Sequence, residues 1–378
     1  MSSFLQSTYQ GKRVLVTGHT GFKGSWLCEW LLALGAEVHA YSLNPEPWQT
    51  LFSQLDLSAR LAGDHRGDLS ERDRIASLVA ELRPDFLFHL AAQPLVRFSY
   101  QIPVETFATN VMGTIHVMDA LRKSSHPCIA VMVTTDKCYE NREWIHGYRE
   151  EDPLGGYDPY SASKGAAEVA ISSYRNSYFS KSDSSVLLAS ARAGNVIGGG
   201  DWAPDRIIPD CIRYIRADEP IPVRSRMATR PWQHVLEPLS GYLALAASIR
   251  QARDHPDPSR PAVEILSSAF NFGPALPSNR TVMELVAELL GHTCGKWFDA
   301  SDPHAVHEAS KLNLSTDKAF HLLGWQPVWQ FEETVAKTAQ WYVKESTHSV
   351  PELTRQQIAA YQTEAAALNI SWALPINR

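Results

Sequence analysis

The chain has 378 residues, long enough for one large domain and a smaller partner domain. Hydrophobic residues make up 44% and charged residues 20%, which is the balance of a folded globular protein and excludes a disordered one. The formal net charge of −6, with no basic stripe, argues against a nucleic-acid partner.

Short apolar runs alternate with longer amphipathic stretches through the first half of the chain. Arg13–Thr17 is predicted to be a buried strand, because its three middle residues form a continuous apolar run. A helix ended by a glycine is expected next over residues 26–34, and then a second strand over Glu37–Ser42. The further predicted elements are strands at 65–68, 86–90, 129–134 and 185–191 and helices at 71–82, 104–123 and 160–179. This alternation predicts an α/β fold, a doubly wound parallel sheet with helices on both faces.

The rhythm changes after residue 192, where Gly and Pro begin to punctuate the chain. These breaks fall at 198–209, 219–222 and 272–277, with helices predicted between and after them at 239–253 and 281–290. We therefore expect a sheet domain over residues 1–192 and a smaller, interleaved cap domain over most of 193–378. Elements near 233–272 are expected to return to the first domain.

The first predicted strand runs directly into a glycine-rich loop that ends at Gly24. Gly18, Gly21 and Gly24 allow a sharp turn and a close approach of the backbone to a pyrophosphate, while the following helix start presents free N–H groups. The spacing is G-x-x-G-x-x-G rather than G-x-G-x-x-G, and a plain strand–helix turn is the alternative interpretation. In this context the loop predicts a Rossmann-type dinucleotide site.

The residues after the second and third strands bear on which dinucleotide would bind. Ser42 and Asn44 stand where an acidic residue would hold the adenosine 2′-OH, and no arginine that could meet a 2′-phosphate follows until Arg60. Lys23 in the loop could serve either cofactor. Asp68 could hydrogen-bond the adenine amino group or serve only as a turn residue. NAD is therefore favoured over NADP.

Tyr160 and Lys164 lie four residues apart at the start of a predicted helix and therefore share one face. An ammonium beside a phenol lowers the phenol's pKa from about 10 toward neutrality, which makes the tyrosinate a general base. A Y-x-x-x-K pair is expected roughly once by chance in a chain of this length. Its position after the sheet strands is what makes this pair a candidate site.

Three polar residues, Thr135, Asp136 and Lys137, follow the fifth predicted strand. This carboxyl edge is where ligands bind in parallel α/β sheets. Thr135 can hydrogen-bond a substrate hydroxyl, and Asp136 and Lys137 place an acid and a base side by side. A helix cap or a solvated turn is the alternative interpretation.

Together these motifs resemble those of the extended short-chain dehydrogenase/reductases. The resemblance is carried by the glycine loop, His89-Leu-Ala-Ala92, Thr109-Asn110 and the Tyr160–Lys164 pair. Thr135-Asp136 is similar to the nucleotide-sugar 4,6-dehydratases within this family, most of which have Glu in place of Lys137. That change resembles the branch that acts on CDP-D-glucose, as do the segments 19–26, 195–202 and 230–235. The resemblance covers roughly residues 10–345.

The resemblance implies a role for each residue that matches a family motif. Thr135, Asp136, Lys137, Tyr160 and Lys164 would be catalytic. The NAD site would comprise Gly18, Gly21, Phe22, Lys23, Gly24, Ser42, Asp68, Leu69, Leu90, Ala91, Ala92, Asn110, Tyr160 and Lys164. The substrate would contact Gln93, Thr135, Asn195, Arg206 and Arg230. The two arginines suit a diphosphate because their fork matches phosphate oxygens, and a surface salt bridge is their alternative role.

The resemblance also implies a reaction, the NAD-dependent conversion of CDP-D-glucose to CDP-4-dehydro-6-deoxy-D-glucose and water. Tyr160 would take the 4-OH proton while the C4 hydride passes to NAD, and that hydride would later return to C6. Lys137, or a water it orients, would remove the C5 proton, and Asp136 would protonate the departing 6-OH. A nucleotide-sugar epimerase or reductase and a non-catalytic NAD-binding protein remain alternatives. We expect a homodimer or homotetramer that pairs through the helix beginning at Tyr160.

No metal, disulfide or membrane segment is expected. His304, His307 and Glu308 are close in sequence, but no cysteine or further histidine completes a metal site. The five cysteines are scattered without a CxxC pair. No run of about 18 apolar residues could span a bilayer, and residues 1–10 lack the apolar stretch of a signal peptide. A soluble protein of the reducing cytoplasm is therefore expected.

Overall fold

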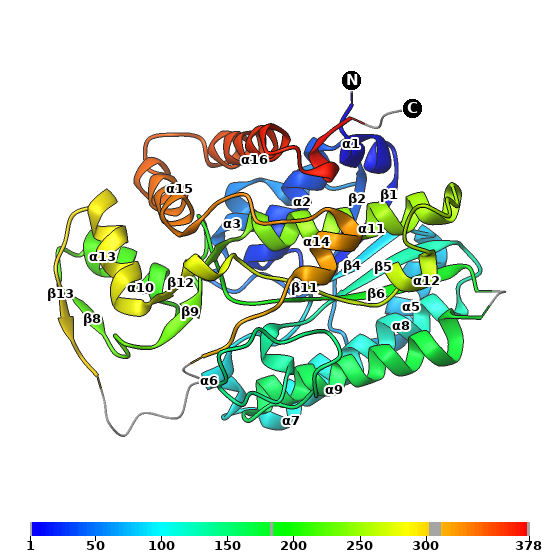
Figure 1. Cartoon of the computed structure of the whole chain (residues 1–378), viewed down its shortest axis with the longest axis horizontal. Helices are drawn as coiled ribbons and strands as arrows, with labels where there is room; N and C mark the ends of the chain where they lie inside the picture. Colours follow the sequence, from blue (N-terminus) through cyan, green and yellow to red (C-terminus); the bar gives the residue numbers. More distant parts are fainter. Residues whose placement is uncertain (1, 182–183, 302–310, 376–378) are drawn as a thin grey trace.

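The computed structural model describes residues 2–181, 184–301 and 311–375, which are built around a seven-stranded parallel sheet (Figure 1). The strands lie in the order β11-β6-β5-β4-β1-β2-β3, and every neighbouring pair is parallel. The strands are β1 (Arg13–Thr17), β2 (Glu37–Ser42), β3 (Gly63–Arg66), β4 (Phe86–His89), β5 (Cys128–Val133), β6 (Val186–Ala193) and β11 (Ala269–Phe272). The predicted doubly wound α/β fold is confirmed.

The direction of strand order reverses between β1 and β4. The chain moves outward from β1 to β2 and β3, and then returns to the other side of β1 to continue with β4. In open α/β sheets, ligands bind at the carboxyl ends of the strands at such a reversal. The glycine loop and the loop after β4 both start at this point.

Two layers of helices cover the sheet (Figure 1). One face carries α5 (Arg72–Leu82), α8 (Thr114–Lys123) and α9 (Pro159–Tyr174), and the other carries α2 (Phe22–Ala33), α11 (Leu236–Asp254) and α16 (Val350–Ala367). Alternate strand residues feed the two layers, because successive side chains point to opposite faces. On β5, for example, Val131 belongs to the core beneath α2 and α11, whereas Met132 belongs to the core beneath α5 and α8.

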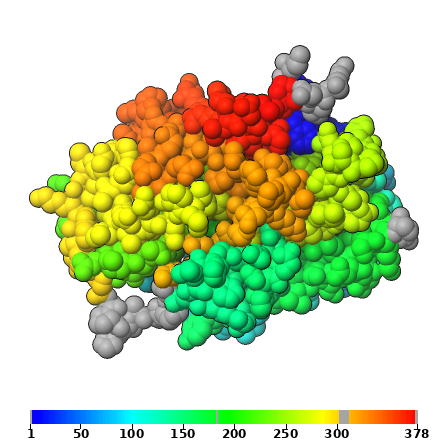
Figure 2. All heavy atoms as spheres, viewed as in Figure 1, coloured from blue at the N-terminus to red at the C-terminus, as the bar shows by residue number. Residues whose placement is uncertain are grey.

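The remaining elements form smaller units beside this sheet. The pairs are β7 (Val196–Ile197) with β10 (Gln233–His234), β9 (Thr229–Pro231) with β12 (Asn279–Thr281), and β8 (Ile221–Val223) with β13 (Trp297–Asp299). The other α-helices are α1 (Phe4–Tyr9), α3 (Thr50–Gln54), α4 (Leu57–Arg60), α6 (Val96–Ser99), α7 (Pro103–Phe107), α10 (Ile207–Arg216), α12 (Val263–Leu266), α13 (Val282–His292), α14 (Asp317–Leu323) and α15 (Phe331–Lys344). Single 3₁₀ turns are η2 (Asp136–Cys138), η4 (Leu276–Ser278) and η5 (Ser371–Ala373), and π turns are η1 (Ala108–Gly113) and η3 (Arg175–Phe179). In the space-filling view the C-terminal segments, orange to red, cover the upper side of the molecule (Figure 2).

Element boundaries differ from the predictions where tertiary contacts intervene. The helix predicted over 104–123 is three pieces, α7, the π turn η1 and α8. The third strand spans Gly63–Arg66 rather than 65–68, so Asp68 lies beyond its end. The division near residue 192 stays a prediction, while β11 returns to the sheet and pairs with β6. In the ranges described, no helix combines the length and apolar character needed to cross a bilayer.

Candidate active site

The glycine loop connects β1 to α2 at the carboxyl edge of the sheet. Gly18 has a φ of +79°, and a Cβ there would lie 2.7 Å from the backbone nitrogen of Ala91. A Cβ at Gly24 would collide with the carbonyl oxygen of Gly18. Gly21 is the N-cap of α2 and has no side chain to bond the first turn, which leaves N–H groups for an anion. This geometry fits a pyrophosphate at the start of α2.

The loop after β4 lies against the glycine loop. The side chain of Thr17 accepts a hydrogen bond from the backbone N–H of Ala91 at 3.2 Å. Asn110, on η1, holds the next part of the loop: its Oδ1 accepts from the N–H of Gln93 at 2.8 Å, and its Nδ2 donates to Ser163 Oγ at 2.9 Å. The structure therefore brings this loop and Asn110 beside the glycine loop and α9.

The residues expected near adenosine end β2 or follow β3. Ser42 Oγ lies 2.9 Å from Thr20 Oγ1, so this hydroxyl is tied to the glycine loop. Asp68 Oδ1 accepts from the N–H of Ser70 at 2.7 Å, which makes its carboxylate part of a turn. Leu69 is buried beside it. The parallel pairing of β2 with β3 brings both groups to the same edge.

Arg66 on β3 is a cation near this edge that the sequence reasoning missed. It is paired in register with Ser42, and its Nη1 donates to the carbonyl of Leu43 at 3.1 Å. A 2′-phosphate would lie at this end of β2. The Nη2 of Arg66 forms an ion pair with Asp64 at 2.7 Å, so its charge is compensated. Only the strand register could have revealed it, because Arg66 is far from β2 in sequence.

Thr135, Asp136 and Lys137 form a tight turn directly after β5. Thr135 Oγ1 accepts from the N–H of Lys137 at 3.3 Å and donates to Asp136 Oδ1 at 3.0 Å. Asp136 is only 4% exposed, and burial raises the pKa of its carboxyl although the Lys137 charge acts in the opposite direction. A buried carboxyl with a raised pKa can keep its proton and serve as an acid.

Tyr160 lies in the first turn of α9, whose N-cap is Asp158. Burial raises the pKa of the Tyr160 phenol to about 12, and a hydrogen bond with Thr135 offsets only part of that rise. The sequence-based expectation of a lowered pKa was wrong in direction for this structure, because desolvation of the phenolate outweighs the hydrogen bond with Thr135 and the charge of Arg206. Lys164 directs its Nζ to the carbonyl of Val133 at 3.4 Å.

Two lysines and an arginine gather around the turn after β5. Burial lowers the pKa of Lys164 to about 8. Burial also lowers the pKa of Lys23 to about 8, helped by the charges of Arg206 and Lys164 and opposed by Asp136. Lys23 lies in the glycine loop, in the first turn of α2, and its charge also interacts with Asp136. Its contact with the cofactor stays a prediction.

Of the predicted substrate residues, Arg206 is the N-cap of α10 and faces the tyrosine. Its Nη1 pairs with Asp201 at 2.7 Å, and this carboxylate is the main reason that the pKa of the guanidinium is raised. The charge of Arg206 also interacts with the Tyr160 phenol. Gln93, by contrast, uses its amide within the protein, where Nε2 donates to Thr106 Oγ1 at 3.0 Å.

Asn195 and Arg230 flank the candidate acid. Asn195 is exposed. It follows Gly194, and a Cβ added to Gly194 would lie only 2.8 Å from Asp136 Oδ2. The charge of Arg230, on β9, acts on Asp136 and lowers its pKa. A small hollow begins at Gly194 and is lined by Gly194, Pro231, Gly273, Pro274, Ala275, Leu276, Asn279, Asn313 and Leu314. The substrate residues predicted after β6 and on β9 are thus brought next to the turn after β5.

His304, His307 and Glu308, the residues considered for a metal site, lie outside the residues that the structure describes. Within residues 2–181, 184–301 and 311–375, no group of three or more His, Cys, Asp or Glu side chains is placed to hold a metal ion.

Comparisons with known proteins show what the whole chain is similar to. The family model described as GDP-mannose 4,6 dehydratase matches residues 15–256. A CDP-glucose 4,6-dehydratase of Salmonella typhimurium is 44% identical over 339 residues, which cover 88% of this chain and 91% of that protein. A dTDP-glucose 4,6-dehydratase of Xanthomonas campestris is 25% identical and covers 88% of this chain and 93% of its own. The solved structure of a dTDP-glucose 4,6-dehydratase from Bacillus anthracis in complex with NAD has a TM-score of 0.69 at 21% identity, over 89% of this chain and 98% of that one, which shows the shared fold.

Proposed function

Because the chain belongs to the nucleotide-sugar 4,6-dehydratase family of the extended short-chain dehydrogenase/reductases, we propose that it converts CDP-D-glucose to CDP-4-dehydro-6-deoxy-D-glucose and water. The turn after β5 carries this proposal, because Asp136, whose charge interacts with Tyr160, is a protonatable carboxyl with the amine of Lys137 next to it. The Salmonella relative supports CDP-D-glucose as the substrate.

NAD is the proposed cofactor, held where the glycine loop meets α2. The fit rests on Gly18, where a Cβ would collide with the loop after β4, and on the uncapped first turn of α2. The chemistry that NAD would supply at this site is reversible hydride transfer, from C4 of the sugar and back to C6. The residues proposed to hold it are those of the glycine loop, Ser42, Asp68, Leu69, Leu90, Ala91, Ala92, Asn110, Tyr160 and Lys164.

The first task of the chain is to remove the proton of the sugar 4-OH, and Tyr160 is proposed as the base. With a pKa of about 12 the phenolate is a strong base, although only a small fraction of the side chain is ionised at neutral pH. The charge of Arg206 favours that ionised form. Arg206 therefore stabilises the form of Tyr160 that performs the step. Lys164 lies on the same helix face, one turn further along α9.

The second task is to eliminate water across C5 and C6. Once C4 is a ketone, the C5 proton is acidic because its loss gives an enolate. Lys137, or a water that it orients, removes this proton, and Asp136 protonates the departing 6-OH. Its raised pKa suits Asp136 to that role. An epimerase or reductase needs Tyr160 and Lys164 but has no use for this acid–base pair, which favours dehydration.

The finer assignments of assembly and location are also proposals. We propose a homodimer or homotetramer in which α9 pairs with its counterpart. Val169 on α9 is 59% exposed, and the adjoining α7 and η1 expose Val104 to 75% and Met112 to 47%. A second copy would cover these apolar side chains. The five free thiols support a reducing compartment, and hence the cytoplasm.

The test is to incubate the purified protein with NAD and with CDP-, dTDP-, UDP- and GDP-glucose in turn. Mass spectrometry should show loss of one water, fastest with CDP-glucose. Loss of water from another nucleotide-glucose at a higher rate would contradict the proposed nucleotide. No loss of water from any of them would contradict the proposed reaction.

A further inference from the structure

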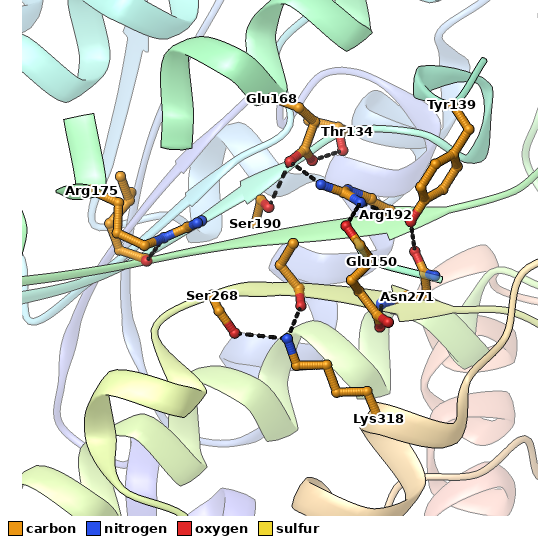
Figure 3. Close-up of polar contacts among 12 residues, drawn as sticks. Thr134, Tyr139, Glu150, Glu168, Arg175, Ser190, Arg192, Ser268, Asn271 and Lys318 are labelled. Atoms are coloured by element: carbon orange, nitrogen blue, oxygen red, sulfur yellow. Dashed lines mark hydrogen bonds and ion pairs between the residues drawn. The ribbon is translucent and has the colours of Figure 1, made fainter. Parts of the chain in front are cut away.

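A buried ion pair joins α9 to the sheet next to the candidate active site (Figure 3). Glu168 of α9 and Arg192 of β6 lie 2.9 Å apart, with side chains only 2% and 5% exposed. The same carboxylate accepts hydrogen bonds from Thr134 Oγ1 at 2.5 Å and from Ser190 Oγ at 2.9 Å. Three donors thus surround a charge that is almost fully removed from water.

Arg192 extends this network to the loop beyond the 3₁₀ turn η2 and to β11. Its Nη1 donates to Tyr139 Oη at 2.8 Å and to the carbonyl of Glu150 at 2.9 Å. The guanidinium carbon also lies 5.0 Å from the centre of the Tyr139 ring. Tyr139 in turn donates to Asn271 Oδ1 at 2.7 Å. Figure 3 shows these side chains converging between the strands and α9.

The two partners of the ion pair hold the two ends of the turn that carries Asp136. Thr134, which is bonded to Glu168, directly precedes Thr135, the N-cap of η2, and Tyr139, which is bonded to Arg192, is the C-cap of η2. A shift of either anchor would therefore move the candidate acid and base relative to Tyr160.

Packing alone does not account for this arrangement, because apolar side chains of similar volume are often at least as stabilising as a buried ion pair. We propose that Glu168 is a positioning residue, which fixes the turn over residues 135–137 against α9 and supplies the counter-charge of Lys164. The positioning role of Glu168 rests on the proposed function, whereas its role as a counter-charge does not.

Glu168 lies one helical turn after Lys164, on the same face of α9. The other titratable groups that act on Lys164 or respond to it are Cys138 of η2, Lys23 of α2 and His89 of β4. Burial raises the pKa of the Cys138 thiol and lowers the pKa of His89 to about 3, so both are neutral near pH 7. Among these neighbours only Glu168 carries a negative charge, and it is the main group that opposes the lowering of the Lys164 pKa by burial.

The counter-charge is tested by titrating Lys164 in the full-length protein. Lysine ε-carbons are labelled with ¹³C, and the Lys164 signal is assigned with the variant Lys164→Arg. Glu168→Gln keeps the shape of the side chain but removes its charge. The pKa of Lys164 should then fall by about 1–3 units, the effect of losing an opposite charge nearby. An unchanged Lys164 titration in Glu168→Gln would overturn this part of the proposal.

A matched control and a double variant separate charge from structure. Ser190→Ala removes one hydrogen bond to the same carboxylate but leaves its charge, so the Lys164 titration should stay as in the wild type. Glu168→Gln leaves Arg192 buried without its partner, which destabilises the fold. In Glu168→Gln/Arg192→Met both charges are gone, so Tm should recover while the Lys164 pKa stays low. Recovery of both would show that the pair is only structural.

The positioning half is tested with Thr134→Val, which removes the bond from the turn to Glu168 but leaves the charge. The kcat for water release should fall by about 10- to 100-fold, with KM and the Lys164 titration near their wild-type values. A wild-type kcat would contradict positioning. The Lys164 titration needs no substrate, so failure of the wild type to dehydrate CDP-glucose overturns the proposed function without touching the counter-charge.

Discussion

A single methyl group at Gly194 is expected to slow the release of water while leaving the fold intact. In Gly194→Ala the new Cβ would lie 2.8 Å from Asp136 Oδ2, whereas ordinary contacts begin at 3.4 Å. The nearest atom is the end of a side chain rather than backbone, so the carboxyl can relieve the collision by moving about 0.6 Å. Displacing a group at a reaction centre by up to 1 Å costs as much as about 10²-fold, so kcat should fall by about 10- to 100-fold.

Two measurements decide this prediction: kcat for water release, followed by mass, and Tm. Asp136 acts only on the leaving group, so exchange of the C5 hydrogen with D₂O should continue in Gly194→Ala. Gly291→Ala on α13 is the matched control, because among the described residues nothing lies within 4 Å of its added Cβ. A wild-type kcat in Gly194→Ala would refute the role given to Asp136. A large fall in Tm would refute the argument that only the side chain of Asp136 moves to accommodate the new Cβ.

Further predictions concern single groups. Tyr160→Phe should abolish turnover without changing Tm or NAD binding, and more than about a tenth of wild-type activity would exclude Tyr160 as the base. Lys137→Met should still form NADH on the enzyme, as read by absorbance, while C5 exchange and water loss slow by about 10²–10⁴-fold; normal dehydration would reduce Lys137 to a turn residue. Glu237 on α11 is fully buried, and burial raises its pKa to about 7 despite hydrogen bonds from Trp329, Tyr361 and Val328. The folded protein thus holds this proton more tightly, and stability should fall by about 3 kcal/mol as pH rises from about 4.5 through 7. Urea unfolding at pH 5 and pH 8 should show this loss in the wild type and a smaller one in Glu237→Gln.

The sheet could be predicted well because its strands are marked by local apolar runs. The bounds of β1 and β2 agree with the prediction, since each strand is enclosed by turn residues and needs no distant contact to define it. The helix expected over 104–123 failed for the opposite reason. Its π turn contains Asn110, whose side chain is bonded to Gln93 and Ser163, and neither partner can be identified from local periodicity.

The candidate site also contains residues that could be predicted from the sequence and residues that could not. The turn at 135–137 and the Tyr160–Lys164 pair could be found because parallel strands bring their carboxyl ends to one edge. Arg66 was missed, and the interaction of Lys23 with Asp136 was not predicted, because these neighbours are set by strand register and by the direction of a helix. The direction of the Tyr160 pKa could not be predicted, because it depends on burial.

The fate of the hydrogen at C4 tests the central claim most directly. CDP-D-glucose labelled with deuterium at C4 is mixed with CDP-D-glucose that carries ¹³C in the sugar but no deuterium, and the product is examined by mass spectrometry and NMR. The account predicts that deuterium appears at C6 of the same molecule that carried it, with none on ¹³C-labelled product. Deuterium that returns to C4 would indicate an epimerase, and deuterium lost to free NADH would indicate a simple dehydrogenase. Either result would contradict the account.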